Sequence, residues 1–331
     1  MAERMANAVR YHSFGKPHEV LVLEDCGIPA IQPDEVLVKL LASPINPSDI
    51  GSILGKYGKL KELPAIAGLE GVGEVVEVGT SVSNLRAGQR VRIPEDVGVW
   101  QEMCAVSSDR LRALPDGLDV ESASMASVNP PTAIRMLEDF VPLEVGDWVI
   151  QNGANSNVGI AVIQYARSIG LRTANVVRRE ALKEPLIALG ADVVVTEEES
   201  YDRHVGDLTG GKQPRLALNS IGGESGLRIL NTLEPGGTHV TFGAMSFDPI
   251  RFPTRQLIFD DVRMCGFWLH RWRQSHSAEE TRALEDRVYA LIEDGTFRFP
   301  VEARFPLERF QDALQRAREP RLGKVLLIGR E

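Results

Sequence analysis

The chain has 331 residues, of which 43% are apolar and 25% are charged, and its formal net charge is −9 at pH 7. This length exceeds what one small core needs and fits two domains. The negative charge argues against a nucleic-acid partner. No segment contains the ~20 consecutive apolar residues that a membrane-spanning helix needs, so no membrane partner is expected.

The three cysteines, Cys26, Cys104 and Cys265, lie far apart and form no C-x-x-C pair. An odd number of cysteines without close spacing predicts neither a disulfide framework nor a cysteine-rich zinc site. The segment from Met1 to Met5 lacks the apolar core of a signal peptide. A reducing cytoplasm is therefore the expected location.

The first 126 residues read as short strands separated by glycine and proline. Alternating apolar and polar positions mark these strands, at 36–40, 74–78, 90–93 and 104–106. Short alternating strands with turn residues between them are typical of antiparallel sheets. We expect a mostly antiparallel, barrel-like N-terminal domain.

From residue 148 onward, strand-like apolar runs alternate with helical segments. The expected strands lie at 148–151, 173–177, 192–196, 215–220, 238–242 and 262–268. This alternation predicts parallel strands joined by right-handed crossovers. The expected fold is α/β, with a doubly wound, six-stranded parallel sheet.

The C-terminal part carries a charged helix at 278–293 and a last strand at 324–328. Because six strands already complete the parallel sheet, we expect the last strand to return to the first domain. The expected division is 1–126 with 268–331 for one domain and 127–267 for the other. The acidic run at 197–199 is expected to be a solvated helix start.

A polar turn joins the first parallel strand to a helix, running from Asn152 to Gly159. Small residues in such a turn let backbone N–H groups approach a pyrophosphate, and the helix N-terminus favours negative charge there. The turn lacks the strict G-x-G-x-x-G pattern, and Asn157 stands where glycine is more usual. Asparagine tolerates a left-handed backbone better than most residues, so a dinucleotide turn remains compatible.

Arg178 and Arg179 follow the second parallel strand, where a dinucleotide-binding fold places its ribose selector. An NAD site uses a carboxylate there, whereas arginines can pair with a 2′-phosphate. Each hydrogen bond to a charged group contributes roughly 1.5–3 kcal/mol, so two arginines can separate NADPH from NADH by two decades. We predict NADPH; the alternative is a pair of surface arginines.

The whole chain resembles the medium-chain dehydrogenase/reductases, which join a GroES-like barrel domain to a Rossmann domain. Residues 68–73 (GLEGVG) are similar to the G-H-E-G-x-G segment of the zinc alcohol dehydrogenases, with Leu69 in place of the metal-binding histidine. The sequence Asn46-Pro47-Ser48-Asp49 stands where those enzymes have a cysteine ligand. A catalytic zinc needs three protein ligands, so we predict a metal-free enzyme.

Several segments are similar to a narrower family, the 2-enoyl thioester reductases of mitochondrial fatty acid synthesis. They are 43–50 (SPINPSDI), 55–58 (GKYG), 62–64 (ELP), 128–133 (VNPPTA) and 266–269 (GFWL). The resemblance implies NADPH-dependent reduction of trans-2-enoyl groups carried by coenzyme A or acyl carrier protein. It also implies a homodimer paired through the strand at 262–268. The chain departs from the family at Pro131, Ile134, Asn157 and Ala244.

The family's catalytic acid is a tyrosine that matches Tyr57. Hydride addition to the β-carbon of an enoyl thioester leaves negative charge on the thioester oxygen, and a donor must stabilise it or protonate the α-carbon. A phenol with an ordinary pKa near 10 remains protonated at neutral pH. Such an acid typically contributes ~10²–10⁴-fold. The alternative is that Tyr57 is one more loop aromatic.

The resemblance also implies the cofactor contacts. Asn129 is expected near the nicotinamide, and Arg178 and Arg179 at the 2′-phosphate. The remaining expected contacts are Asn155, Ser156, Asn157 and Val158 at the pyrophosphate, Phe242, Gly243, Ala244 and Met245 at the ribose and nicotinamide, Phe267, Trp268 and Leu269 farther along, and Lys324. Trp268 can equally be a core aromatic. The basic segment 270–273 is a candidate for contacting the phosphates of coenzyme A or phosphopantetheine.

Two other functions stay open at this point. A quinone or alkenal reductase of the same superfamily needs no acid aimed at an α-carbon. A non-catalytic NADPH-binding protein would keep the cofactor turn and Arg178 and Arg179 without turnover. Replacement of Tyr57 by phenylalanine distinguishes the first, and the absence of NADPH oxidation identifies the second.

Overall fold

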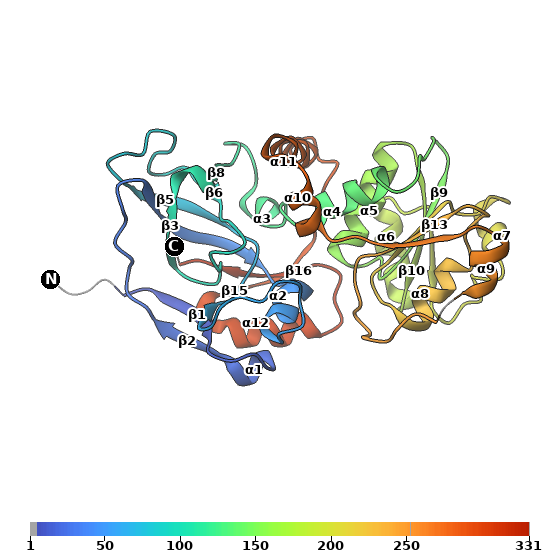
Figure 1. The fold of residues 1–331 in the computed structure, drawn as a ribbon, viewed down its shortest axis with the longest axis horizontal. Coiled ribbons are helices and arrows are strands. Elements are labelled where there is room, and N and C mark those ends of the chain that lie inside the picture. Colours follow the sequence, from blue (N-terminus) through green and yellow to red (C-terminus); the bar gives the residue numbers. More distant parts are fainter. Residues whose placement is uncertain (1–4, 252, 331) are drawn as a thin grey trace. The chain divides into compact units, whose positions relative to one another are not determined.

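A computed structural model describes residues 5–251 and 253–330. The chain divides into two compact units, which Figure 1 shows with their elements labelled. Unit 1 contains the chain up to Ser127 and again from Pro300, and unit 2 runs from Val128 to Phe299.

Unit 1 is built from two sheets. The smaller has the strand order β2-β1-β4 and the larger the order β15-β16-β3-β5-β6-β8, with β7 also paired to β3. All neighbours are antiparallel except β15 and β16. The strands are β1 (Asn7–Tyr11), β2 (Leu21–Asp25), β3 (Glu35–Pro44), β4 (Ala65–Ile66), β5 (Val72–Val78), β6 (Arg90–Arg92), β7 (Met103–Ser107), β8 (Arg112–Ala113), β15 (Val301–Pro306) and β16 (Lys324–Ile328). The expected antiparallel domain and the return of the last strand to it are confirmed.

Short helices complete unit 1. They are α1 (Pro17–Val20), α2 (Pro47–Ile53), η1 (Ser108–Arg110), α3 (Val120–Ser124), η3 (Leu307–Arg309) and α12 (Phe310–Arg318). Side chains of a strand alternate between its faces, so Val36, Val38 and Leu40 of β3 enter one core together with Trp100. Among them, the Trp100 side chain is fully buried and its indole N–H donates to Ser43 Oγ at 3.1 Å.

Unit 2 contains one six-stranded sheet with the order β11-β10-β9-β12-β13-β14, and every pair is parallel. Its strands are β9 (Trp148–Asn152), β10 (Arg172–Val177), β11 (Val193–Thr196), β12 (Leu216–Asn219), β13 (Thr238–Thr241) and β14 (Arg263–Gly266). Its helices are α4 (Asn129–Glu138), α5 (Asn157–Ser168), η2 (Glu180–Leu182), α6 (Lys183–Ala188), α7 (Val205–Thr209), α8 (Gly223–Leu230), α9 (Thr254–Phe259), α10 (Leu269–Ser275) and α11 (Ala278–Glu293). The predicted doubly wound sheet is confirmed.

Helices cover both faces of this sheet because alternate strand positions need cover on opposite sides. Trp148 and Ile150 of β9 share a core with Ile229 and Leu230 of α8. Gln151 points to the other face, where its amide donates to the Gly159 carbonyl of α5 at 2.9 Å. The turn between β9 and α5 is therefore held between two packed layers.

The expected second domain boundary, at 267/268, differs from the structure. Residues 268–299 cluster with unit 2 and not with the barrel-like unit. Arg287 of α11 lies 2.8 Å from the Glu138 carboxylate of α4, and Gln164 of α5 exchanges two hydrogen bonds with the Arg298 backbone, at 2.9 and 3.1 Å. These contacts join segments far apart in the sequence, so the apolar pattern alone did not reveal them.

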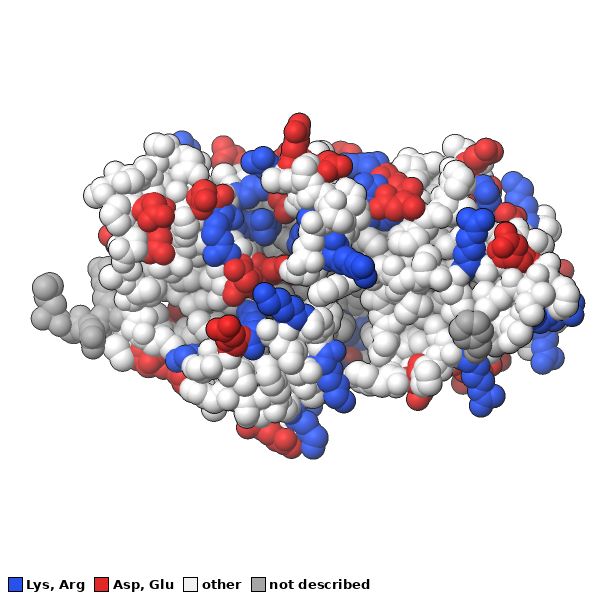
Figure 2. Space-filling view, viewed as in Figure 1, with Lys and Arg blue, Asp and Glu red and all other residues white. Residues whose placement is uncertain are grey.

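Among the described residues, no helix has the length and apolar character needed to cross a membrane. On the face that Figure 2 shows, Lys and Arg side chains lie interspersed with Asp and Glu side chains. Charges of both signs are therefore mixed on that face.

Candidate active site

The expected site residues fall in both units. Tyr57 and Lys324 belong to unit 1, and the other expected contacts belong to unit 2. Within unit 2, most of them follow the carboxyl ends of parallel strands, the edge at which open α/β sheets bind ligands.

The turn after β9 presents the N-terminus of α5. Gly153 adopts φ +58°, and Ser156 caps the helix by accepting the Gly159 N–H on its hydroxyl at 3.1 Å. Asn157 is the first residue of α5 and is absent from the described positive-φ residues, so a left-handed asparagine is not needed. A Cβ on Gly159 would lie 2.5 Å from the Ala154 carbonyl oxygen, which explains glycine there. Asn155, Ser156, Asn157 and Val158 thus lie together at a capped helix N-terminus.

Arg178 and Arg179 come directly after β10, beside that turn in the strand order. Arg178 is exposed and Arg179 half-buried. The nearest following acid, Glu180, pairs with Lys183 at 3.1 Å. The nearest acidic side chain that follows the two arginines is therefore paired with a lysine.

The segment from Phe242 to Met245 follows β13 at the same edge. The Phe242 N–H donates to Asn219 O at 3.0 Å, and the Met245 N–H donates to Ser220 O at 3.1 Å. A Cβ on Gly243 would lie 2.8 Å from the Ser220 carbonyl oxygen, so the two loops pack backbone against backbone. This packing fixes four expected contact residues beside the end of β12.

The residues near β14 and α4 have separate environments. Phe267 stacks edge-on against Phe140 with ring centroids 5.9 Å apart, and Leu269 is buried. Trp268 is half-buried, so it is not a fully enclosed core aromatic. Asn129 is buried at the start of α4. Arg273 of the basic segment lies 3.8 Å from the Glu285 carboxylate, which leaves Arg271 as its exposed arginine.

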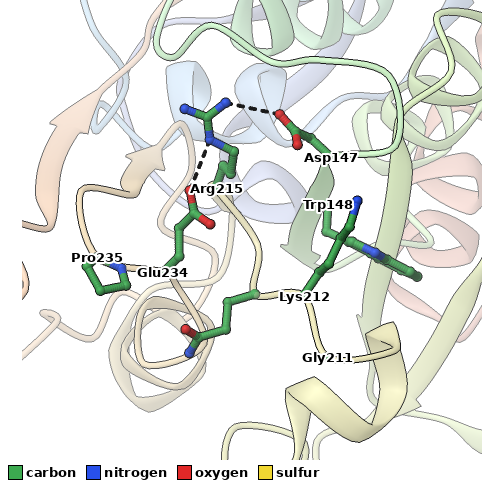
Figure 3. A pocket seen from close by; sticks show the side chains of 8 residues that line it. Asp147, Trp148, Gly211, Lys212, Arg215, Glu234 and Pro235 are labelled. Atoms are coloured by element: carbon green, nitrogen blue, oxygen red, sulfur yellow. Dashed lines mark hydrogen bonds and ion pairs between the residues drawn. The ribbon is translucent and has the colours of Figure 1, made fainter.

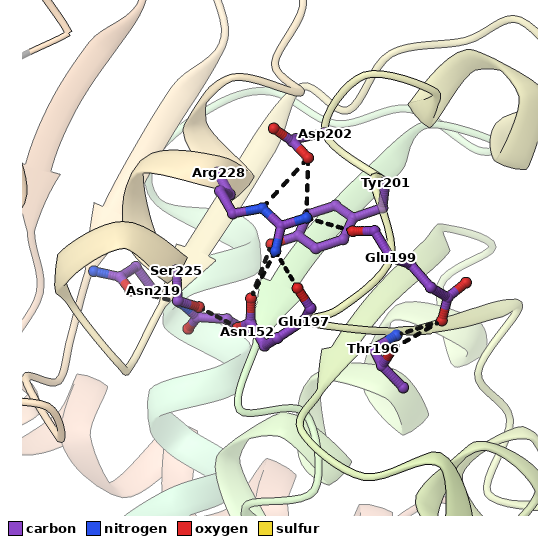
Figure 4. A network of polar contacts seen from close by, with 9 residues as sticks. All are labelled: Asn152, Thr196, Glu197, Glu199, Tyr201, Asp202, Asn219, Ser225 and Arg228. Atoms are coloured by element: carbon purple, nitrogen blue, oxygen red, sulfur yellow. Dashed lines mark hydrogen bonds and ion pairs between the residues drawn. The ribbon is translucent and has the colours of Figure 1, made fainter.

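A polar network at this edge was missed from the sequence (Figure 4). The Arg228 guanidinium of α8 donates to the carbonyls of Glu197 and Glu199, lies 3.0 Å from the Asp202 carboxylate and covers the Tyr201 ring at 4.2 Å. The network holds the loop after β11. The expected solvated helix at 197–199 is wrong, because no helix begins there and Arg228 binds two of its carbonyls.

Neutral amides connect the same network to the centre of the sheet. Asn152 Nδ2 donates to Asn219 Oδ1 at 2.8 Å and to Ser225 Oγ at 3.0 Å. Asn219 Oδ1 also accepts the Gly222 N–H at 3.0 Å. The polar residues at the two strand ends were visible in the sequence, but their pairing needs the strand order β9-β12.

A different hollow, of about 430 Å³, lies at the amino ends of the strands (Figure 3). Arg215 spans it, at 3.1 Å from the Asp147 carboxylate and 3.0 Å from the Glu234 carboxylate. Trp148 and Lys212 line the opposite side. Since the glycine turn follows the other end of β9, this hollow is separate from the expected cofactor turn.

In unit 1, α2 is anchored by a buried polar cluster made of Asn46, Asp49, Glu70 and Lys324. Asp49 accepts the N–H groups of Asn46 at 2.7 Å and Leu69 at 2.9 Å. Glu70 accepts Asn46 Nδ2 at 2.9 Å and the Ser127 N–H at 2.7 Å. Lys324 Nζ donates to Ile45 O at 3.2 Å and to Asn46 Oδ1.

Burial favours the neutral forms of two members of the cluster, Asp49 and Lys324. It raises the pKa of Asp49 to about 6, against the opposing effect of backbone hydrogen bonds. Burial also lowers the pKa of Lys324 to about 8. Charged groups out of water persist only when paired and hydrogen-bonded, as these are.

This cluster does not fit a zinc ion. Leu69 offers no electron pair, and both carboxylates already accept hydrogen bonds on each oxygen. The Cys104 thiol, which burial keeps neutral by raising its pKa to about 12, is not a ready ligand. In the described part of the chain, no three His, Cys, Asp or Glu side chains are grouped to hold a metal.

Tyr57 lies in the loop after α2 and is half-buried. The backbone of this loop folds back on the helix, because the Lys56 N–H donates to Gly51 O at 2.9 Å and the Gly55 N–H to Ser52 O at 3.1 Å. Glycines with positive φ flank the tyrosine, Gly55 at +70° and Gly58 at +43°. Tyr57 is thus carried by a tight turn and not by a long free loop.

Two family models match the chain. They are the alcohol dehydrogenase GroES-like domain over residues 32–116 and the zinc-binding dehydrogenase over residues 157–286. Together with the antiparallel unit and the parallel six-stranded unit, these matches define a medium-chain dehydrogenase/reductase.

Relatives narrow this class. The chain is 42% identical over 320 residues to the mitochondrial enoyl-(acyl-carrier-protein) reductase of Rattus norvegicus, covering 95% of this chain and 86% of that one. The protein from Xenopus tropicalis with the same name is 43% identical over 334 residues, covering 98% and 95%. This chain belongs to the enoyl-(acyl-carrier-protein) reductase family.

Solved structures agree with the fold. The heterodimeric mitochondrial 2-enoyl thioester reductase Etr1p/Etr2p from Candida tropicalis has a TM-score of 0.89 at 30% identity, covering 98% of this chain and 99% of that one. A complex of Etr1p with NADP and crotonyl-CoA has a TM-score of 0.88 at 30% identity and the same coverage. A structure from Bacillus thuringiensis named for an NADPH:quinone reductase has a TM-score of 0.90 at 30% identity and the same coverage.

The names of these relatives correct one expectation. The rat and frog proteins are described as mitochondrial, and so is the Candida tropicalis reductase. This finding overturns the expected cytoplasmic location, which rested on the composition of the first residues and the lack of cysteine pairs.

Proposed function

We propose that this protein uses NADPH to reduce the 2,3-double bond of trans-2-enoyl thioesters carried by coenzyme A or acyl carrier protein. The similarity to named enoyl-(acyl-carrier-protein) reductases over 95% of the chain carries this proposal. A solved relative bound to NADP and crotonyl-CoA supports the cofactor and the substrate class.

Three groups of residues hold the cofactor, and all of their members except Lys324 belong to unit 2. The N-terminus of α5, with Asn155, Ser156, Asn157 and Val158, meets the pyrophosphate with backbone N–H groups and a partial positive charge. Arg178 and Arg179 meet the 2′-phosphate. The remaining cofactor contacts are made by Asn129, Lys324 and the segments 242–245 and 267–269. The capped turn and the position of the two arginines directly after β10 support this arrangement.

NADPH, when bound, supplies a hydride to the β-carbon of the enoyl thioester. Tyr57 then acts as the acid: its hydroxyl hydrogen-bonds the thioester oxygen as negative charge develops and delivers the proton to the α-carbon. One C–H bond forms at each carbon while the π bond of the C=C and the O–H bond of Tyr57 break. The Tyr57 phenolate then regains a proton from water, so electrons and protons balance. The half-buried, turn-held phenol supports this role, since an acid must be positioned to be effective.

No metal participates in this chemistry. The cluster of Asn46, Asp49, Glu70 and Lys324 takes the structural role of anchoring α2, and α2 carries the Tyr57 turn. Lewis-acid polarisation of the carbonyl would need open metal ligands, whereas these oxygens already accept hydrogen bonds.

Two copies of the chain pair through the edge of the parallel sheet in this proposal. β14 ends the strand order, so one side of its backbone has no strand neighbour within unit 2. Ile258 and Phe259 of the neighbouring α9 are 65% and 72% exposed. An exposed edge strand beside exposed apolar side chains favours a homodimer; sedimentation of the purified protein measures it directly.

A substrate panel tests the function. Either NADPH or NADH is supplied as the reductant. The acceptors are crotonyl-CoA, longer trans-2-enoyl-CoAs, an enoyl-acyl carrier protein, an alkenal and a quinone, and oxidation of the cofactor is followed by its absorbance. We expect NADPH oxidation with the enoyl thioesters. The likeness to the Bacillus thuringiensis structure makes a quinone reductase the second candidate, and turnover with quinones alone would establish it.

A further inference from the structure

Helix α2 contains a glycine, Gly51, at a position where alanine would stabilise the helix more. Gly51 lies within the seven-residue helix, and glycine is less favourable there than alanine because its backbone loses more freedom. Gly51 is not among the described glycines with positive φ, so its backbone conformation does not require glycine. Something outside the helix backbone must therefore account for the missing side chain.

The Tyr57 side chain packs directly against the position that a side chain at residue 51 would take, and its Cβ is the closest atom. A Cβ on Gly51 would lie 3.1 Å from Tyr57 Cβ, 3.5 Å from Cδ2 and 3.6 Å from Cγ. Optimal carbon–carbon contacts are roughly 3.5–4.0 Å, so one of these three contacts is too short. The first atom to be displaced is the Cβ that sets the direction of the phenol.

The backbone leaves Tyr57 little room to retreat. The Leu54, Gly55 and Lys56 N–H groups donate to the carbonyls of Ile50, Ser52 and Gly51, at 2.9, 3.1 and 2.9 Å. A Cβ on Gly55 would lie 3.0 Å from Phe14 Cβ and Cγ, so the turn is closely packed on its other side as well. A side chain added at position 51 would therefore displace the Tyr57 side chain and move its phenol group.

We propose that Gly51 is a positioning residue for catalysis: because it has no side chain, Tyr57 Cβ can pack close to it, and this contact sets where the phenol hydroxyl is presented. The proposal rests on the proposed function of Tyr57 as the acid. It assigns no contact between Gly51 and substrate or cofactor. A misplacement of well under 1 Å can be costly, because effective proton donation needs close alignment.

The test is a double-mutant cycle with Gly51→Ala and Tyr57→Phe, assayed with crotonyl-CoA and NADPH. We expect Gly51→Ala to lower kcat about tenfold in the wild-type background and by less than twofold in the Tyr57→Phe background, because contacting residues are not additive. NADPH affinity, followed by cofactor fluorescence, is expected to stay within twofold. The matched control is Gly206→Ala in α7, where an added Cβ meets nothing within 4 Å.

Thermal unfolding separates positioning from simple damage. Gly206→Ala is expected to raise Tm slightly and leave kcat unchanged. If Gly51→Ala lowers Tm, it should lower Tm by less in a Tyr57→Gly background, because the Tyr57 Cβ that the added methyl meets at 3.1 Å is then absent. An unchanged kcat in Gly51→Ala, an equal loss of kcat in the Tyr57→Phe background, or an equal loss of Tm in the Tyr57→Gly background overturns the proposal.

These outcomes differ from failure of the proposed function. If wild-type protein turns over no enoyl thioester, or Tyr57→Phe costs less than tenfold, the acid role fails. The difference in Tm between the single and double variants at positions 51 and 57 would still show whether Gly51 determines the packing of the Tyr57 side chain.

Discussion

The two units hold their buried polar groups in opposite ways. Around α2, unit 1 buries charge: Asp49, Glu70 and Lys324 are all buried, and the two carboxylates act electrostatically on the ammonium. At the carboxyl edge of its sheet, unit 2 buries neutral amides, with Asn152 paired to Asn219 and Gln151 to Asn175 at 2.8 Å each. The charged cluster in unit 1 anchors helix α2, which precedes the proposed acid Tyr57. In unit 2 the buried amides are neutral, and Arg178, Arg179 and the N-terminus of α5 are the groups proposed to bind the anionic cofactor.

The largest expected effect comes from breaking the charged cluster. Lys324→Met leaves two buried carboxylates without their ammonium, and removal of one partner from a buried pair costs roughly 3–5 kcal/mol. Urea unfolding of the variant measures the free energy of unfolding. Arg318→Met, at an exposed position, is the control and should change it by less than about 0.5 kcal/mol. A loss below about 1 kcal/mol in Lys324→Met would show that the cluster is not a strongly coupled unit.

The pH dependence of stability should differ in sign between the units. Burial lowers the pKa of His239 in β13 to about 4, below its unfolded value near 6.5, so its contribution is complete above pH 6.5 and is lost as pH falls toward 4. Burial raises the pKa of Asp49 to about 6, so protonation of Asp49 below pH 6 favours the folded state.

His239→Leu isolates the contribution of unit 2. Relative to wild type, the variant should gain about 3 kcal/mol of unfolding free energy between pH 6.5 and pH 4, because 1.36 kcal/mol corresponds to each pKa unit. Denaturant titrations at several pH values measure this difference. Parallel pH curves for the two proteins would mean that His239 is not held neutral by burial.

The arginine pair should affect one cofactor and not the other. Arg178→Ala with Arg179→Ala removes the cations proposed to bind the 2′-phosphate, and about a hundredfold rise in KM for NADPH is expected. NADH, which lacks that phosphate, serves as the control within the same variant, and its KM should change by less than threefold. Equal effects on both cofactors would place the 2′-phosphate elsewhere.

Local sequence signals predicted the repetitive parts of the fold. The helix at 278–293 and the strand at 324–328 have the expected bounds, because their apolar periodicity and flanking residues are local. The turn between β9 and α5 was also predicted from its small residues, although its left-handed residue is Gly153 and not Asn157.

Long-range pairing set the limits of that prediction. Assignment of 268–299 to unit 2 depends on Arg287 meeting Glu138, and the loop at 197–199 depends on Arg228 from α8. The buried cluster of Asp49, Glu70 and Lys324 likewise joins segments that are distant in the sequence. The spacing of these residues along the chain therefore could not predict the cluster. The family resemblance identified Tyr57 as the candidate acid. The role proposed for Gly51 can be inferred only from the contact between helix α2 and the Tyr57 side chain in the structure.

Single-turnover reduction of crotonyl-CoA by NADPH in wild type and Tyr57→Phe tests the central claim most directly. We predict that the variant binds NADPH with wild-type affinity and that its rate of NADPH oxidation falls about a hundredfold, as expected for loss of a positioned acid. A rate within tenfold of wild type, measured with a variant of unchanged Tm, would contradict a metal-free mechanism that depends on this phenol.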